Sequence, residues 1–201
     1  TDKRIDDRPY GGGAGMVIEA DIIDKALNST DSEYVIELTP QGKRLDQTHL
    51  KELSQKENIT LICGRYEGID HRVRKRIDAQ LSIGDYILSG GEIPALVLID
   101  ALARLQPGVI TTESVNSDSF EHGLLKHPQY TRPQNWHGSE VPSTLLSGNH
   151  QEIKDDRLSK SLGYTWLNRP DLLIGRKFCK RELALLVKFV QNHERRGEDY
   201  E

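Results

Sequence analysis

Apolar positions in the first half of the chain follow two spacings, which predict strands alternating with helices. Short apolar runs at residues 34–40, 59–63 and 86–88 are typical of strands, and the run at 59–63 has the composition of a strand buried on both faces. Apolar residues at helical intervals predict helices over residues 16–27 and 43–56. Strands separated by helices indicate an α/β domain with a parallel sheet.

Residues 92–105 predict a further helix that is apolar nearly all round, so we expect it to pack inside the domain or against another subunit. Its polar residues Glu92, Asp100 and Arg104 recur at multiples of four, along one stripe. Asp100 and Arg104 could pair with each other. The alternative is a functional task for Arg104, because an arginine on an apolar helix is costly without a partner.

The second half of the chain is less regular. Residues 107–147 are rich in Thr, Ser, Asn, Asp, Pro and His, as in a long linker or in a binding segment that orders with its ligand. Helices are expected over residues 151–162 and 180–193. We therefore expect a catalytic domain over residues 1–110, a flexible linker over 111–147 and a small α-helical domain over 148–201.

Composition narrows the class of protein. The 201 residues are 36% hydrophobic and 29% charged, which suits one globular domain with a small appendage. Cys63 and Cys179 lie far apart and fit a reducing compartment. No apolar run approaches the roughly 20 residues that span a bilayer, so we expect no membrane partner, and the compartment that the cysteines indicate is the cytoplasm. The net charge of −4 argues against a uniformly basic nucleic-acid binder, although basic clusters occur at residues 72–76 and 176–181.

Glycines follow the predicted strands where a site would form. Pro40 ends the first strand and is followed by a turn at Gln41-Gly42, Gly64 follows the second strand, and Gly90-Gly91 separates the third strand from its helix. The carboxyl ends of parallel strands share one edge of the sheet, where α/β proteins usually bind ligands. A plain strand-to-helix connection is the alternative.

A glycine-rich loop at residues 6–16 offers backbone amides that could cradle phosphates, or is simply a flexible loop. It lacks the Gly-Lys-Ser/Thr ending of a P-loop.

Seven segments, taken together and in order, closely resemble bacterial tRNA (guanine-N1)-methyltransferases, the TrmD family of the SPOUT class. They are residues 6–16, 40–42, 63–70, 82–92, 118–120, 130–133 and 147–150. The resemblance extends to about Leu173. It implies a parallel sheet threaded into a deep trefoil knot, which sequence rules would not suggest because knots are rare. Family members carry a strand and a helix before the glycine-rich loop, which we expect to be missing here.

The resemblance also implies a cofactor and a set of contacts. The cofactor would be S-adenosylmethionine, bent into the loops of the knot. The positions that match its contacts are Leu38, Pro40, Gly64, Tyr66, Glu67, Ile83, Gly84, Asp85, Tyr86, Ile87, Leu88, Gly90, Gly91 and Pro94. Magnesium is expected to assist. The sequence shows no dedicated carboxylate cage, and Glu67 is the candidate contact for the methyl donor or the ion.

The implied reaction is methyl transfer to N1 of the guanosine at tRNA position 37, immediately 3′ of the anticodon. Asp118 matches the general base that removes the N1 proton, although an Asp-Ser pair in a loop more often forms a turn or caps a helix. Arg104 matches the residue that stabilises charge on the guanine oxygen. Arg65, Arg132 and Arg169 are candidate phosphate contacts.

The family's site lies between the two subunits of a homodimer. Two alternatives remain at this point: a non-catalytic knotted RNA-binding module, and a phosphate-handling nucleotide enzyme. The second lacks the lysine and the metal-binding hydroxyl that such enzymes need.

Overall fold

A three-stranded parallel sheet organises the amino-terminal unit, Thr1–Thr111, of the computed structural model. The structure describes residues 4–111, 114 and 117–196. The central strand β3 (Tyr34–Arg44) pairs with β4 (Ile59–Cys63) on one side and β5 (Ala79–Ser82) on the other, in the order β4-β3-β5. The predicted α/β class and parallel sheet are therefore confirmed; the start of the chain and parts of the predicted linker and carboxyl-terminal domain lie outside the described residues.

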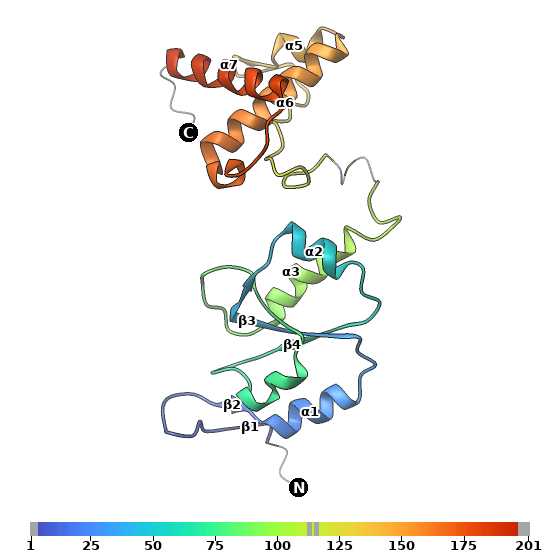
Figure 1. The fold of residues 1–201 in the computed structure, drawn as a ribbon, viewed down its shortest axis with the longest axis vertical. Helices are drawn as coiled ribbons and strands as arrows, with labels where there is room; N and C mark the ends of the chain where they lie inside the picture. Colours follow the sequence, from blue (N-terminus) through green and yellow to red (C-terminus); the bar gives the residue numbers. More distant parts are fainter. Residues whose placement is uncertain (1–3, 112–113, 115–116, 197–201) are drawn as a thin grey trace. The chain divides into compact units, whose positions relative to one another are not determined.

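Helices cover both faces of this sheet (Figure 1). α2 (Gln47–Leu53) and α3 (Glu92–Ala103) lie on one face, whereas α1 (Ala20–Asn28) and the 3-10 helix η1 (His71–Arg76) lie on the other. The apolar pattern of β3 explains the two layers, because successive side chains of a strand point to opposite faces.

The two cores follow from that alternation. On the face of α2 and α3, Ile36 and Leu38 pack with Leu81 and the fully buried Leu98. On the other face lies a smaller cluster, formed by Leu27, Val35, Ile62, Val73 and Ile77. Large apolar side chains of this kind each remove substantial area from water, so these clusters hold the sheet between its helices.

A short antiparallel pair, β1 (Asp6–Asp7) and β2 (Val17–Ile18), closes the glycine-rich loop. Ile18 also forms a parallel bridge with Ile69 beyond β4. The helix predicted over residues 16–27 is therefore wrong at its start, because Val17 and Ile18 are extended and α1 begins only at Ala20.

The third strand is not the predicted one. The sheet uses β5 (Ala79–Ser82), whereas Tyr86, Ile87 and Leu88 form no strand and are 53%, 80% and 40% exposed. β5 is short and mixed in composition, so it carries a weak strand signal, while the apolar run after it serves as loop wall instead of core.

The predicted turn at Gln41-Gly42 is wrong as well. β3 continues to Arg44, with a shift in register against β5 between Leu38 and Lys43. The strand ladder is irregular at Pro40, which has no N–H to donate, so the proline falls where a regular hydrogen bond is not required. Because Lys43 and Arg44 belong to β3, the helix predicted over residues 43–56 shortens to α2.

The carboxyl-terminal unit, Thr112–Glu201, is mainly helical in its described part. Its elements are β6 (Asn135–Trp136), β7 (Ser139–Glu140), α5 (Ser143–Leu146), α6 (His150–Asn168), η2 (Pro170–Leu173) and α7 (Lys180–Arg196). α6 and α7 pack against each other at Gly163, where the ring of Phe189 occupies the space that a side chain would need. Within the described residues, no helix is long and apolar enough to cross a membrane.

Asp70 fixes the entry into η1. Its carboxylate accepts from the Arg72 backbone amide at 2.8 Å and from the Arg72 guanidinium, with Nη2 to Oδ2 at 2.7 Å. These hydrogen bonds lower the pKa of Asp70 to about 2, mainly through the Arg72 side chain. The hydrogen bonds from Arg72 therefore stabilise the ionised form of the Asp70 carboxylate in the folded state.

We expect Asp70→Asn to lower the free energy of unfolding by about 1 kcal/mol at pH 7. A depressed folded-state pKa stabilises the fold above the unfolded value of 3.8, and that contribution is lost as pH falls towards 2. Urea unfolding between pH 7 and pH 2 should show the parent and the variant converging in acid. The exposed Asp31→Asn is the control, with a smaller effect at pH 7, and a constant difference would contradict the assignment.

Candidate functional site

A cavity of about 420 Å³ lies where the loops following the parallel strands meet. One wall comes from the irregular part of β3, a second from the loop after β4, and a third from the loop between β5 and α3. This is the carboxyl edge of the sheet, the position that parallel strand connections leave for a ligand.

Every predicted cofactor position except Asp85 lines this cavity. Those that do are Leu38, Pro40, Gly64, Tyr66, Glu67, Ile83, Gly84, Tyr86, Ile87, Leu88, Gly90, Gly91 and Pro94. Asp85 is exposed and does not belong to the lining. The structure thus brings together three segments that are far apart in the chain, residues 38–40, 64–67 and 83–94.

Seven further lining residues were missed by sequence reasoning: Glu37, Thr39, Gln41, Gly68, Leu81, Ser82 and Ser89. Glu37 is the most informative of them, because it is 7% exposed and accepts a 2.6 Å hydrogen bond from Gln80. A carboxylate inside the apolar run of β3 was the available signal, since a buried acid requires a partner.

The start of α3 lies directly against the end of β4. The Gly91 amide donates to the Gly64 carbonyl at 2.9 Å, and a Cβ on Gly91 would come within 2.7 Å of the Cys63 Cα. No side chain fits at Gly91 without displacing β4 or the helix. Burial, with a smaller effect of Glu92, raises the pKa of the neighbouring Cys63 thiol.

The loop after β4 is held from its other side by the glycine-rich loop. The Glu67 amide donates to the Met16 carbonyl at 3.0 Å, and the Glu67 side chain covers Gly15, where a Cβ would lie 2.6 Å from its Cγ. Tyr66 has a φ of 57°, a backbone conformation that is uncommon for a residue with a side chain, and the residue is 69% exposed. The glycine-rich loop therefore supports the cavity rim and does not line the cavity.

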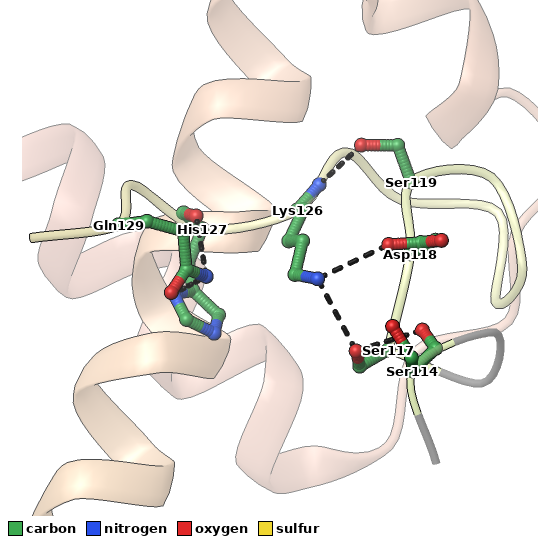
Figure 2. Close-up of polar contacts among 7 residues, drawn as sticks. All are labelled: Ser114, Ser117, Asp118, Ser119, Lys126, His127 and Gln129. Carbon is green, nitrogen blue, oxygen red and sulfur yellow. Dashed lines mark hydrogen bonds and ion pairs between the residues drawn. The ribbon is translucent and has the colours of Figure 1, made fainter. Parts of the chain in front are cut away.

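Asp118 belongs to the carboxyl-terminal unit, in a tight loop shown in Figure 2. The Lys126 ammonium lies 3.1 Å from Asp118 Oδ1 and donates to Ser117 Oγ at 3.2 Å, while the Lys126 backbone amide donates to Ser119 Oγ at 2.9 Å. The Asp118 side chain is 36% exposed, so one carboxylate is both paired and reachable from solvent.

This loop is fastened to α6 through a buried hydroxyl. The Leu125 amide donates to Oγ1 of Thr165, which is fully buried and itself donates to the Ser161 carbonyl at 2.6 Å. Leu124 is 8% exposed, which adds an apolar anchor beside the hydrogen bond. The segment that carries Asp118 is therefore part of the same packed unit as α6.

The predicted arginines occupy different settings. Arg104 is exposed at the carboxyl cap of α3, in the amino-terminal unit. Arg132 is exposed and precedes Pro133 in a cis peptide bond. Arg169 binds Asp171 through two hydrogen bonds of 2.8 and 2.7 Å and lies 5.7 Å from the centre of the Phe120 ring. Arg65 lines the cavity and binds Glu92.

Across the described residues, no group of three or more His, Cys, Asp or Glu side chains is arranged to hold a metal ion. Glu67, the predicted candidate contact, lines the cavity but belongs to no such group.

Comparison with known sequences identifies the family of the chain. A sequence model described as tRNA (guanine-1)-methyltransferase TrmD matches residues 1–175. The chain belongs to this family. Its members depend on S-adenosylmethionine.

Individual relatives agree with the family match. The tRNA (guanine-N(1)-)-methyltransferase of Serratia marcescens is 48% identical over 206 residues, which cover 99% of this chain and 81% of the relative. The protein of the same description from Buchnera aphidicola subsp. Baizongia pistaciae is 53% identical over 192 residues, covering 92% and 77%. The corresponding Chromobacterium violaceum protein is 47% identical over 203 residues, covering 96% and 80%.

We expect Gly91→Ala to weaken S-adenosylmethionine binding by at least about tenfold, because the new Cβ would overlap the end of β4 and displace a cavity loop. Titration calorimetry measures this directly. Gly64→Ala is the matched comparison: its Cβ would meet Gly68 Cα at 3.6 Å, an ordinary contact, so a milder loss is expected. Equal affinity of the parent and Gly91→Ala would contradict the close-approach argument.

Proposed function

We propose that this chain transfers a methyl group from S-adenosylmethionine to N1 of the guanosine at tRNA position 37. The observation that carries the proposal is the meeting of the family's cofactor segments in one cavity, in a chain matched to the family over residues 1–175. The tRNA (guanine-N1)-methyltransferase activity is what the relatives' descriptions state.

The cavity lining suits the cofactor. Leu38, Ile83, Leu88 and Pro94 provide apolar walls, and the Gly90-Gly91 segment presents main chain without side chains. A pocket of apolar walls with backbone polar groups is suited to a nucleobase and its sugar. The size of about 420 Å³ lies within the range of pockets that bind small molecules.

Bound in this cavity, S-adenosylmethionine supplies an electrophilic methyl group. The protein must also remove the proton from guanine N1, and we assign this to the carboxylate of Asp118, which lies beside the Lys126 ammonium and is partly exposed. Loss of that proton leaves negative charge on the guanine oxygen, which the Arg104 guanidinium stabilises. The target base must leave its stack to expose N1.

A homodimer would complete the site. In the single chain, α3 exposes a run of large apolar side chains: Ile93 at 57%, Leu96 at 61%, Val97 at 44% and Ile99 at 53%. Helix surfaces of this kind are covered in soluble proteins, usually by a symmetric partner. The proposal includes the deep trefoil knot of the SPOUT class, an active site between the subunits, and a cytoplasmic location.

The proposed division of labour follows the predicted domains. Residues 1–110 bind the cofactor, residues 111–147 carry Asp118, and residues 148–201 contribute to tRNA binding. Arg132 and Arg169 are proposed phosphate contacts. Arg169 would exchange its ion pair with Asp171 for one with a phosphate. Magnesium is proposed to assist near Glu67, in company with ligands from substrate or water, because Mg²⁺ often keeps several waters.

Calorimetric titration with S-adenosylmethionine, followed by methylation of two tRNA transcripts, tests the proposal. We expect cofactor binding and a methyl group on N1 of a transcript with guanosine at position 37. The matched transcript with adenosine there should remain unmodified. Absence of cofactor binding contradicts the class of enzyme. Binding without methylation would favour a non-catalytic RNA-binding module.

Asp118→Asn should retain the parent's affinity for S-adenosylmethionine and lose turnover by about 10²- to 10⁴-fold, because the amide cannot take the N1 proton. Arg104→Ala should likewise lower turnover and leave the unfolding temperature unchanged. Single-turnover methylation measures both rates, with the exposed Glu57→Gln as a control of parental activity. A parental rate in Asp118→Asn would show that another group is the base.

A further inference from the structure

Two loops of the cofactor cavity are joined by one pair of side chains. Arg65 lies in the loop after β4, and Glu92 is the first residue of α3. Arg65 Nε donates to Glu92 Oε1 at 2.6 Å. Beneath this pair, Arg65 forms an antiparallel bridge with Gly90, and the Gly91 amide donates to the Gly64 carbonyl at 2.9 Å. The main chain and the side chains thus connect the same two loops.

The ion pair lies over the Gly90-Gly91 backbone, which has no side chains that could hold this backbone in place. A Cβ on Gly90 would meet the Glu92 carboxylate and lie 3.1 Å from Arg65 Cγ, so the pair covers the Gly90 Cα. Glycine loops gain close approach to a ligand but lose conformational restriction. The contact between Arg65 and Glu92 lies at the place where Gly90 and Gly91 have no side chains to restrict the conformation of the backbone.

Glu92 is suited to hold this position. It occupies the first turn of α3, where unpaired backbone amides and the helix dipole favour a negative charge. Its own backbone amide and then the Arg65 guanidinium lower the pKa of Glu92, so it is ionised at neutral pH. The guanidinium therefore faces a carboxylate that is charged throughout the physiological range.

Global stability does not explain the pair. The two side chains are 56% and 47% exposed, and ion pairs with such exposure contribute little to the free energy of unfolding. What the pair does is join two walls of the cavity, the loop after β4 and the start of α3.

We propose that Arg65 and Glu92 act together as a clasp that positions the two glycine loops for cofactor binding. This inference rests on the proposed function. It gives Arg65 a role different from the phosphate contact expected from its charge, because the Nε donor of its guanidinium is engaged by Glu92 beside the cavity. Arg65 and Glu92 are positioning residues, acting on the cofactor through the loops that they join.

A double-mutant cycle tests the clasp. Arg65→Gln, Glu92→Gln and the double variant are titrated with S-adenosylmethionine by calorimetry, and their unfolding temperatures and tRNA affinities without cofactor are measured. We expect each single variant to bind S-adenosylmethionine about three- to tenfold more weakly, and the double variant to be no weaker than the worse single. Unfolding temperatures and tRNA affinities should match those of the parent.

Lys56 and Glu33 provide the matched control. Their ion pair is 3.3 Å long with side chains 36% and 46% exposed, and neither residue lines the cavity. Lys56→Gln and Glu33→Gln should therefore leave cofactor affinity unchanged, which separates the clasp from a general effect of removing a surface ion pair.

Three results would overturn the clasp: parental cofactor affinity in Glu92→Gln, independent losses that multiply in the double variant, or weaker tRNA binding as the sole effect of Arg65→Gln. The last result would assign Arg65 to phosphate. Parental binding and methylation are measured first. A parent that binds no S-adenosylmethionine overturns the proposed function and the clasp together, whereas an active parent with multiplying losses overturns only the clasp.

Discussion

The cavity depends on one close approach, between the first turn of α3 and the last residues of β4. A bare Cα at Gly91 lets the helix begin against Cys63, and its amide satisfies the Gly64 carbonyl where the strand's own ladder has ended. Buried backbone groups need partners, so this contact also settles the hydrogen bonding of the loop. The shape of the cavity follows, because the loop after β4 and the loop before α3 form two of its walls.

Some elements of this region can be predicted from the sequence and others cannot, for physical reasons. β4 and α3 are recognisable because each is a continuous apolar run of a length typical for its element. Ile87 and Leu88 carry the same composition for another purpose, since they wall a cavity and remain exposed in the single chain. Hydrophobicity alone cannot distinguish a side chain that covers a ligand from one that fills a core. The third strand was predicted at residues 86–88 instead of at β5 because of that ambiguity.

The candidate site was easier to predict than the strands, because its residues lie in loops with unusual chemistry. Glycine pairs after strands and the ordered series of family segments indicate the cavity without any knowledge of register. What the sequence does not give is the pairing of charges. The contacts of Arg65 with Glu92, Arg169 with Asp171 and Asp118 with Lys126 join residues by loop geometry, and several partners were possible for each. Two of the arginines expected to face phosphate, Arg65 and Arg169, are therefore bound to carboxylates.

The buried hydroxyl of Thr165 has a mechanical consequence. It holds the Leu125 amide, and through the short loop before it the segment bearing Asp118, to the carboxyl-terminal end of α6. The segment that bears Asp118 and α6 therefore belong to one packed unit. Under the proposed function, a tRNA that displaced α6 would displace Asp118 with it, so substrate binding by this unit and placement of the proposed base would be coupled.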